Sequence, residues 1–236
     1  MEAEAAALAA RALTKRYRLD GALRQVLRGL DLTVAAGEVT VVSGAPGAGK
    51  TTLVRVLTAL DRPTSGVVLY GGLPAWRRTW LGWRLRPPRR GYALPLFKDP
   101  TASLDPVWPL WRTVTEAACA VGVIQPRSTT ERHRVAEELF ARAGLPARHV
   151  DSSPKDLTRA QCQRVAVLRL AAARPAVVAA DEPTAGLDDA EATGVAWQLR
   201  NLADAGVAVL VTAGQPGKLG ELSERVLVLS EGRIEP

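Results

Sequence analysis

Short apolar runs and segments of helical spacing alternate along the chain. The apolar runs are rich in β-branched residues and predict strands at residues 39–42, 67–70, 177–180, 207–211 and 226–229. Apolar residues three and four positions apart predict helices at residues 52–60, 130–143, 160–173 and 190–203, most of them followed closely by glycine or proline. Strands that alternate with helices predict an α/β fold with a mainly parallel sheet and helices on its faces.

Proline crowds the middle of the chain and indicates a change in organisation there. Prolines stand at positions 87, 88, 95, 100, 106, 109 and 126. Because such residues interrupt regular structure, they often mark boundaries. We therefore expect a partly separate, mainly helical insertion at about residues 95–160.

A glycine-rich loop joins the strand predicted at residues 39–42 to the helix that follows it. Residues 44–51 read GAPGAGKT and match the pattern GxxxxGK[ST]. In such a loop the backbone N–H groups surround a phosphate, the helix N-terminus adds positive potential, and the lysine neutralises the terminal phosphates. The pattern predicts a nucleoside triphosphate site. Its candidate binding residues are Gly44, Ala45, Gly47, Ala48, Gly49, Lys50, Thr51 and Thr52.

Two acidic residues, Asp181 and Glu182, follow the buried strand predicted at residues 177–180. A carboxylate at the carboxyl end of a parallel strand points into the crevice where ligands bind. Asp181 would hold Mg²⁺ there, together with the hydroxyl of Thr51. Glu182 would act as a general base on an attacking water molecule.

Composition excludes several other classes of protein. The 236 residues are 47% hydrophobic and 23% charged, which is typical of a folded chain. No run approaches the roughly 20 apolar residues of a membrane-spanning helix, and the acidic start does not resemble a secretory signal. Two cysteines are too few for a disulfide framework or a zinc site. Because arginine is spread along the chain, the net charge of +7 does not by itself indicate a nucleic-acid partner.

These motifs resemble the ATP-binding subunit of ABC transporters, and the resemblance runs from about residue 13 to residue 235. Residues 181–188 read DEPTAGLD, almost letter for letter the Walker B motif and D-loop of that family. Residues 13–17 place Tyr17 where the family has the aromatic residue that stacks on adenine, and residues 29–38 match its antiparallel lead-in strands. Residues 98–106, KDPTASLDP, resemble the Q-loop region of the peptide and nickel importer subfamily.

The resemblance implies a single ABC ATP-binding domain over residues 1–236 that binds ATP and Mg²⁺. It also implies a second ATP-binding subunit, because each ATP site of this family takes the signature peptide from the facing chain. Membrane permease subunits would be the other partners, and no nucleic acid is expected. The chain would then lie in the cytoplasm, peripheral on the inner face of the cell membrane. It ends directly after the last predicted strand, so we expect it to lack the C-terminal extension of many importer cassettes.

Three positions depart from the family pattern, and all concern the γ-phosphate end of the site. The signature LSGGQ reads LTRAQ at residues 157–161, so Thr158 keeps a hydroxyl but Arg159 and Ala160 replace two glycines. Lys98 stands in place of the Q-loop glutamine, and Ala213 in place of the switch histidine. In one interpretation, which we favour, the ATPase is degenerate: it binds ATP, hydrolyses it slowly or not at all, and relies on a competent partner. In the other, Arg159 acts as a catalytic arginine finger in trans and Lys98 supplies further positive charge.

Trp76, Trp80 and Trp83 fall at helical spacing between arginines 77, 78, 84 and 86. The spacing predicts a helix with one aromatic face. A basic aromatic helix can lie on a membrane surface or a nucleic acid. We favour the simpler interpretation, a packing stripe with the arginines solvated on the other side.

Two other functions fit the same motifs. One is an ABC protein that never meets a transporter, such as an accessory factor in phosphonate breakdown or a regulator. The other is an ABC-type ATPase that handles nucleic acid, which the scattered arginines disfavour. The residues do not indicate a transported substrate.

Overall fold

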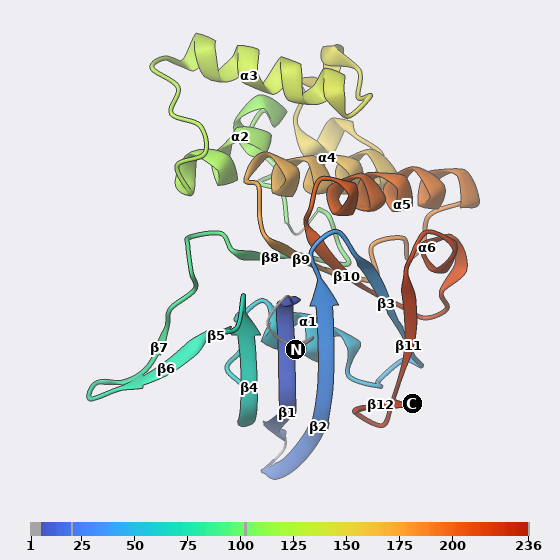
Figure 1. The fold of residues 1–236 in the computed structure, drawn as a ribbon. Helices are drawn as coiled ribbons and strands as arrows, with labels where there is room; N and C mark the ends of the chain where they lie inside the picture. The colour runs from blue at the N-terminus through green and yellow to red at the C-terminus, as the bar shows by residue number, and fades with distance from the viewer. Residues whose placement is uncertain (1–5, 20, 102, 236) are drawn as a thin grey trace.

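The computed structural model describes residues 6–19, 21–101 and 103–235. Within them the strands form a six-stranded, a four-stranded and a two-stranded sheet. The acidic start at residues 1–4 and Ala102 of the expected Q-loop region lie outside the described residues. Figure 1 shows the two larger sheets in the lower half of the view and a group of helices above them.

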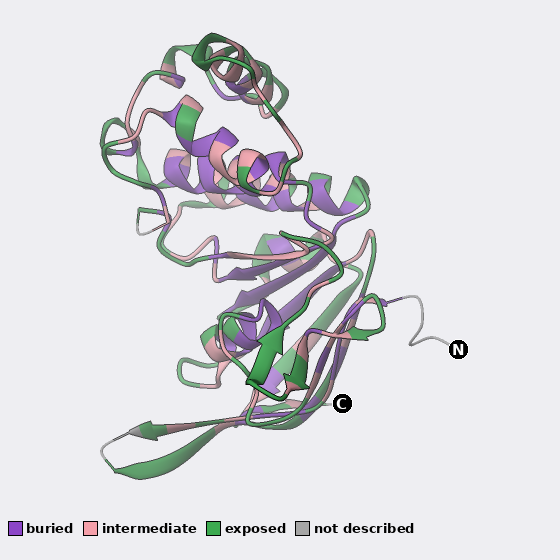
Figure 2. Ribbon diagram, turned by 90° about the vertical axis from the view of Figure 1, so that its left-hand side faces the viewer, coloured by how far each residue is buried: buried purple, intermediate pink, exposed green. Residues whose placement is uncertain are grey.

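The six-stranded sheet has the order β12-β11-β3-β10-β9-β8, and all neighbouring strands run parallel except β11 and β12. Its strands are β3 (Val39–Ser43), β8 (Ala93–Leu96), β9 (Val177–Asp181), β10 (Ala208–Ala213), β11 (Arg225–Ser230) and β12 (Arg233–Glu235). Every residue of β3, β9 and β10 is buried, as Figure 2 shows for the centre of the sheet. Strands covered on both faces read as continuous apolar runs, which explains why these three were visible in the sequence.

The four-stranded sheet is antiparallel and has the order β2-β1-β4-β5. Its strands are β1 (Ala6–Leu19), β2 (Ala22–Ala35), β4 (Ser65–Tyr70) and β5 (Leu73–Pro74). Helix α1 (Lys50–Leu57) packs against strands of both larger sheets. One apolar cluster therefore joins α1 to both sheets, with Leu53 and Leu57 of the helix fully buried in it.

The remaining helices cover the other face of the six-stranded sheet and extend beyond it (Figure 1). They are α2 (Leu110–Ala120), α3 (Thr129–Arg142), α4 (Arg159–Ala172), α5 (Asp189–Asp204) and α6 (Gly217–Glu221), with 3₁₀ turns η2 (Ala147–His149) and η3 (Pro154–Asp156). Three of these helices are preceded by an N-cap side chain that accepts a hydrogen bond from the backbone N–H three residues later. The N-cap residues are Ser128 for α3, Thr158 for α4 and Asp188 for α5. These caps satisfy N–H groups that the first helical turn leaves unpaired.

The prediction of an α/β fold with a mainly parallel sheet and an antiparallel edge is confirmed. The predicted helices at residues 130–143, 160–173 and 190–203 begin and end within one residue of α3, α4 and α5. Helices α2 and α3 lie within residues 95–160, and whether this segment is a separate subdomain stays a prediction.

The helix predicted for the tryptophan segment is wrong. The segment is a hairpin of β6 (Trp76–Thr79) and β7 (Gly82–Leu85), with Trp80 in the turn. Gly82 has φ 104°, a left-handed conformation that a right-handed helix excludes, and the Thr79 hydroxyl donates to the Gly82 carbonyl at 2.7 Å. The packing stripe is also wrong, because the side chains of Trp80 and Trp83 are 92% and 50% exposed.

Candidate functional site

The glycine-rich loop at residues 44–49 connects β3 to α1 at the carboxyl end of the parallel strands. Gly44 donates its N–H to the Ala213 carbonyl at 3.1 Å, and a Cβ atom at Gly44 would lie 2.4 Å from the Leu229 carbonyl oxygen. Gly49 caps α1 with φ 109°. The loop therefore needs glycine at both ends, once for close approach of the backbone and once for its conformation.

Lys50 is the first residue of α1 and is 6% exposed. Its ammonium donates to the carbonyl oxygens of Gly44 at 2.6 Å and Ala45 at 3.0 Å, and it lies 3.0 Å from Glu182 Oε1. The positive charge is thus held over the loop, beside the N-terminal end of the helix. A lysine ammonium beside a helix N-terminus favours the binding of an anion at this loop.

Asp181 and Thr51 meet across the site. The Thr51 hydroxyl donates to Asp181 Oδ2 at 2.7 Å, and the Thr212 hydroxyl at the end of β10 donates to Asp181 Oδ1 at 2.9 Å. Asp181 is 5% exposed, and each of its two carboxylate oxygens accepts one of these hydrogen bonds. Thr212 was not expected from the sequence as part of the site. The one signal in the sequence that could have indicated Thr212 is its position directly before Ala213, which stands in place of the switch histidine.

Glu182 follows Asp181 with φ 42°, a left-handed conformation that is uncommon for residues other than glycine. Its N–H points to both the carbonyl and the hydroxyl oxygen of Thr212, each at 3.1 Å. The strained residue is thus held by β10, which directs its side chain toward the loop. Strain of this kind gathers at functional sites.

The Glu182 carboxylate lies between two lysines. Lys98 Nζ lies 2.5 Å from Oε2, and Lys50 Nζ lies 3.0 Å from Oε1. Hydrogen bonding to Lys98 and then to Lys50 holds the pKa of Glu182 below its usual range, although partial burial acts in the opposite direction. The lysine that stands in the Q-loop position therefore contacts the candidate general base directly.

The altered signature lies at the start of α4. Thr158 and Gln161 form a reciprocal capping box, in which the Thr158 hydroxyl accepts the Gln161 N–H at 3.2 Å. Ala160 is buried, and the Arg159 guanidinium donates to the Lys98 carbonyl at 3.2 Å. Arg159 and Lys98 are thus in contact within one chain, although 61 residues separate them.

Tyr17 lies on β1 near the other end of α1. Its hydroxyl donates to Asp61 Oδ2 at 2.6 Å, and Arg55 of α1 contacts the same oxygen at 3.1 Å. Burial raises the pKa of Tyr17, as does the Asp61 carboxylate, whereas the Thr52 side chain acts in the opposite direction. Lys15 Nζ lies 4.8 Å from the centre of the Tyr17 ring. Asp61, which fixes the phenol, was not expected from the sequence.

The structure brings most of the expected residues together. The phosphate-binding loop, Lys50, Thr51, Asp181 and Glu182 form one connected set, with Lys98 and Arg159 joined to it through Glu182. Thr158 and Tyr17 lie on separate elements, and their hydroxyl groups bond to Gln161 and Asp61 instead. Ala213 contributes only a buried methyl group and its backbone.

The acidic oxygen of Asp181 and the hydroxyl of Thr51 fit Mg²⁺, a cation that prefers oxygen ligands. Among the described residues there is no group of three or more His, Cys, Asp or Glu side chains that could hold a metal ion. Mg²⁺ is usually bound by one or two carboxylates together with the phosphates of a substrate.

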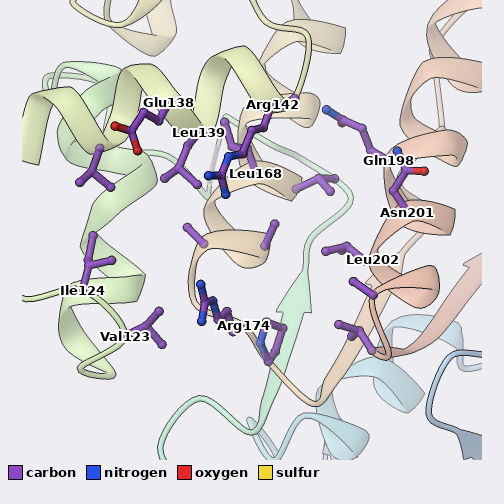
Figure 3. A pocket seen from close by; sticks show the side chains of 18 of the residues that line it. Val123, Ile124, Glu138, Leu139, Arg142, Leu168, Arg174, Gln198, Asn201 and Leu202 are labelled. Atoms are coloured by element: carbon purple, nitrogen blue, oxygen red, sulfur yellow. The ribbon is translucent and has the colours of Figure 1, made fainter.

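A groove of about 850 Å³ opens elsewhere, between α3, α4 and α5 (Figure 3). Leu139, Leu168 and Leu202 line its apolar part, and Arg142 and Arg174 lie among them. None of the phosphate-loop residues lines this groove, so it is separate from the candidate site. In the part of the chain that is described, no helix is long and apolar enough to cross a membrane.

A family model described as ABC transporter matches residues 27–185. The chain is similar to the lipoprotein-releasing system ATP-binding protein LolD of Myxococcus xanthus, with 32% identity over 97% of this chain and 98% of LolD. It is also 32% identical to the macrolide export ATP-binding/permease protein MacB of Nitrobacter winogradskyi, over 94% of this chain. The chain spans only 33% of that MacB, and 62% of the probable D,D-dipeptide transport ATP-binding protein DdpF of Escherichia coli, to which it is 28% identical.

Solved structures show the same fold. The dimeric ATP-binding cassette MJ0796 bound to ADP and Pi superposes with a TM-score of 0.81 over 97% of each chain, at 24% identity. The cbiO1 protein of Clostridium perfringens, part of the complex cbiONQ, gives a TM-score of 0.78 over 98% of this chain and 87% of its own, also at 24% identity. The expected peptide and nickel importer subfamily is not confirmed, because the relatives include proteins of export and of lipoprotein release.

Proposed function

Because the chain belongs to the ABC transporter family, we propose that it binds ATP with Mg²⁺ and drives transport as an ATP-binding cassette. The observation that carries this proposal is the contact between Thr51 and Asp181 beside a complete phosphate-binding loop. The loop and Lys50 would take the β- and γ-phosphates, and Thr51 with Asp181 would hold Mg²⁺. Tyr17 would stack on the adenine.

The proposed partners rest on the family to which the chain belongs. We propose a second ATP-binding subunit, identical or different, which faces this chain head to tail and receives Thr158 and Arg159 at its phosphate end. Permease subunits in the membrane would respond when the two cassettes close on ATP and reopen after hydrolysis. The cassette would then work at the cytoplasmic face of the membrane. The solved MJ0796 cassette is dimeric, which supports a dimeric arrangement for this chain as well.

Hydrolysis by this chain would be slow. Glu182 would act as the general base, but its carboxylate is engaged by Lys98 and Lys50. Ala213 offers no side-chain group to orient a water molecule, and Arg159 and Ala160 bring side chains where the family has bare backbone. The Arg159 guanidinium bonds to a carbonyl of its own chain, which favours the degenerate interpretation over an arginine finger.

The direction and cargo of transport belong to the permease subunits. The importer of the peptide or nickel type that the Q-loop region predicts is supported by 28% identity to DdpF. Identity of 32% to MacB and LolD equally supports a cassette for export or lipoprotein release. An accessory ABC protein without a permease is the second candidate function, and the substituted signature is the observation that favours it.

ATP binding and turnover by the purified chain test the proposal. A fluorescent ATP analogue should bind in a manner that requires Mg²⁺, and Lys50→Ala should abolish that binding. Turnover should be slow but above that of Glu182→Gln, which keeps the size of the side chain and removes its charge. No binding at all would overturn the proposal. Co-purification of the chain with permease subunits would support the transport function over the accessory one.

A further inference from the structure

The hairpin of β6 and β7 stands apart from the rest of the molecule. It forms a separate two-stranded sheet, in which Trp76 pairs with Leu85 and Thr79 with Gly82. Figure 1 shows it projecting sideways from the edge of the four-stranded sheet. A two-stranded hairpin is marginally stable in water by itself. Its base is attached through Trp76, which packs against the apolar cluster around α1.

The outer end of the hairpin is apolar and uncovered. Trp80 is 92% exposed and the adjacent Leu81 is 60% exposed, and both lie in the turn. Trp83 on β7 is half exposed, with the Arg62 guanidinium 4.9 Å from its ring centre. Every residue from 80 to 86 is exposed. Contiguous exposed apolar residues of this kind mark interaction sites.

Arginines follow directly behind this apolar tip. Arg77 lies opposite Arg84 across the two strands, and Arg78 and Arg86 lie on the same hairpin and its exit. Like charges directly opposite each other destabilise a strand pair. No carboxylate of the described residues pairs with any of these four arginines, and the sequence has no Asp or Glu between positions 62 and 98. The hairpin therefore lacks a negative partner within the described part of its own chain.

We propose that this hairpin docks on an anionic lipid surface. Trp80 and Leu81 enter the interface between headgroups and acyl chains, and the arginines behind them contact lipid phosphates. Indole side chains favour that interface, and basic residues close to it gain from the negative surface potential. The proposal adds direct contact with lipid to the contact with permease subunits, and it does not depend on ATP hydrolysis.

The order of residues along the hairpin distinguishes lipid from nucleic acid. An aliphatic and an aromatic side chain together form the tip, and the four arginines lie two to five residues behind it along the chain. This layering matches the depth profile of a membrane surface, in which an apolar layer lies under a layer of phosphates. A surface that binds single-stranded nucleic acid places its basic and stacking groups at the same level along a groove.

Flotation of the full chain with lipid vesicles tests the proposal. The chain should float with vesicles of equal parts phosphatidylglycerol and phosphatidylcholine, and should stay behind with phosphatidylcholine alone. The double variant Trp80→Ser/Leu81→Ser should lower the partition coefficient at least about tenfold, because it removes most of the apolar area at the tip. Trp197→Ser is the matched control, since Trp197 is 49% exposed on α5, and it should bind as the parent does.

A second pair of variants tests the charges. Arg77→Gln/Arg84→Gln should lower binding to anionic vesicles at least about tenfold, given roughly fivefold for each basic residue near such a surface. Arg127→Gln/Arg148→Gln removes the same charge from exposed positions elsewhere and should have little effect. Mg²⁺-dependent ATP binding should be unchanged in all four variants, which separates a failure here from a failure of the proposed function.

Three results would overturn the proposal. The first is no flotation with anionic vesicles, and the second is flotation that the tip and arginine variants leave unchanged. The third is tight binding of single-stranded DNA that these same variants abolish while vesicles are not bound. Quenching of tryptophan emission by brominated lipid, retained in the Trp197→Ser control and lost in the tip variant, would support insertion of Trp80.

Discussion

The ion pair between Lys98 and Glu182 makes a prediction about the rate of hydrolysis. Lys98 Nζ lies 2.5 Å from Glu182 Oε2, so the carboxylate must leave this partner before it can accept a proton from water. The lysine side chain is 53% exposed and the glutamate side chain 18%, so solvent weakens the pair. A pair of this exposure contributes about 1 kcal/mol, at the upper end of the range measured for surface ion pairs.

Lys98→Gln removes the charge and keeps a polar side chain of similar length. Releasing about 1 kcal/mol from the barrier corresponds to a rate increase of about fivefold. Because Lys98 is the leading cause of the lowered pKa of Glu182, the pKa should also rise toward its ordinary value, and with it the basicity of the carboxylate. The assay is single-turnover hydrolysis at saturating Mg²⁺, with the protein in excess over ATP and far above its dissociation constant, where binding differences do not enter.

Controls separate this effect from others. Lys98→Arg keeps the charge and should stay near the parent rate, and Lys155→Gln removes an exposed lysine outside the site. In a Glu182→Gln background, Lys98→Gln should bring no gain, because the pair is already absent. A rate for Lys98→Gln that equals or falls below the parent rate would refute the reasoning. Lys98 would then contribute charge to the γ-phosphate instead of restraining the base.

Three further changes test the way the site is held. Asp61→Asn removes the partner of Arg55 and should cost about 0.5–1 kcal/mol of the free energy of unfolding at pH 7, because the pair is partly exposed. The hydrogen bond from Arg55 holds the pKa of Asp61 below its usual value. The Asp61 carboxylate therefore stabilises the fold above about pH 4, and this contribution is lost as the pH falls through the lowered pKa. In urea titrations, the free energy of unfolding of the variant should fall less between neutral and acid pH than that of the parent. Gly44→Ala places a Cβ atom 2.4 Å from a backbone oxygen, so it should lower the free energy of unfolding by about 1–3 kcal/mol. A melting curve that is unchanged from the parent would contradict this expectation. Thr212→Val leaves Asp181 without a hydrogen bond of 2.9 Å and should weaken Mg²⁺-dependent ATP binding, measured by titration calorimetry, more than binding without Mg²⁺.

Strands buried on both faces could be predicted from the sequence, and the exposed hairpin β6–β7 could not. Strands β3, β9 and β10 are mostly apolar and buried along their whole length, as is typical of strands covered on both faces of a sheet. The hairpin β6–β7 has almost no buried positions, so its residues carry no signal of period two. The helical spacing of its three tryptophans was coincidental. Without burial to impose a pattern, the turn at Gly82 decided the conformation.

The site was predictable where backbone geometry requires a particular residue type. Gly44 and Gly49 are needed by close approach and by a left-handed φ, and those requirements appear directly in the letters of the motif. Contacts between distant side chains leave no such trace. Thr212 reaches Asp181 across two neighbouring strands, and Asp61 reaches Tyr17 from a turn 44 residues away. Such partners become visible only when the fold brings their elements together.

The departures from the family pattern are connected in space, and this bears on how they should be interpreted. Independent loss of motif residues would leave unrelated side chains at separate positions. Here the Arg159 guanidinium holds the Lys98 backbone at 3.2 Å, and the Lys98 ammonium holds Glu182 at 2.5 Å. Two substituted positions thus form one chain of contacts that ends on the candidate base. Ala213, the third, is buried and contacts the phosphate-binding loop through its backbone, since its carbonyl accepts the Gly44 N–H at 3.1 Å. Together they describe a cassette whose candidate base is restrained by its own Q-loop position, and for this reason we expect Lys98→Gln to raise turnover.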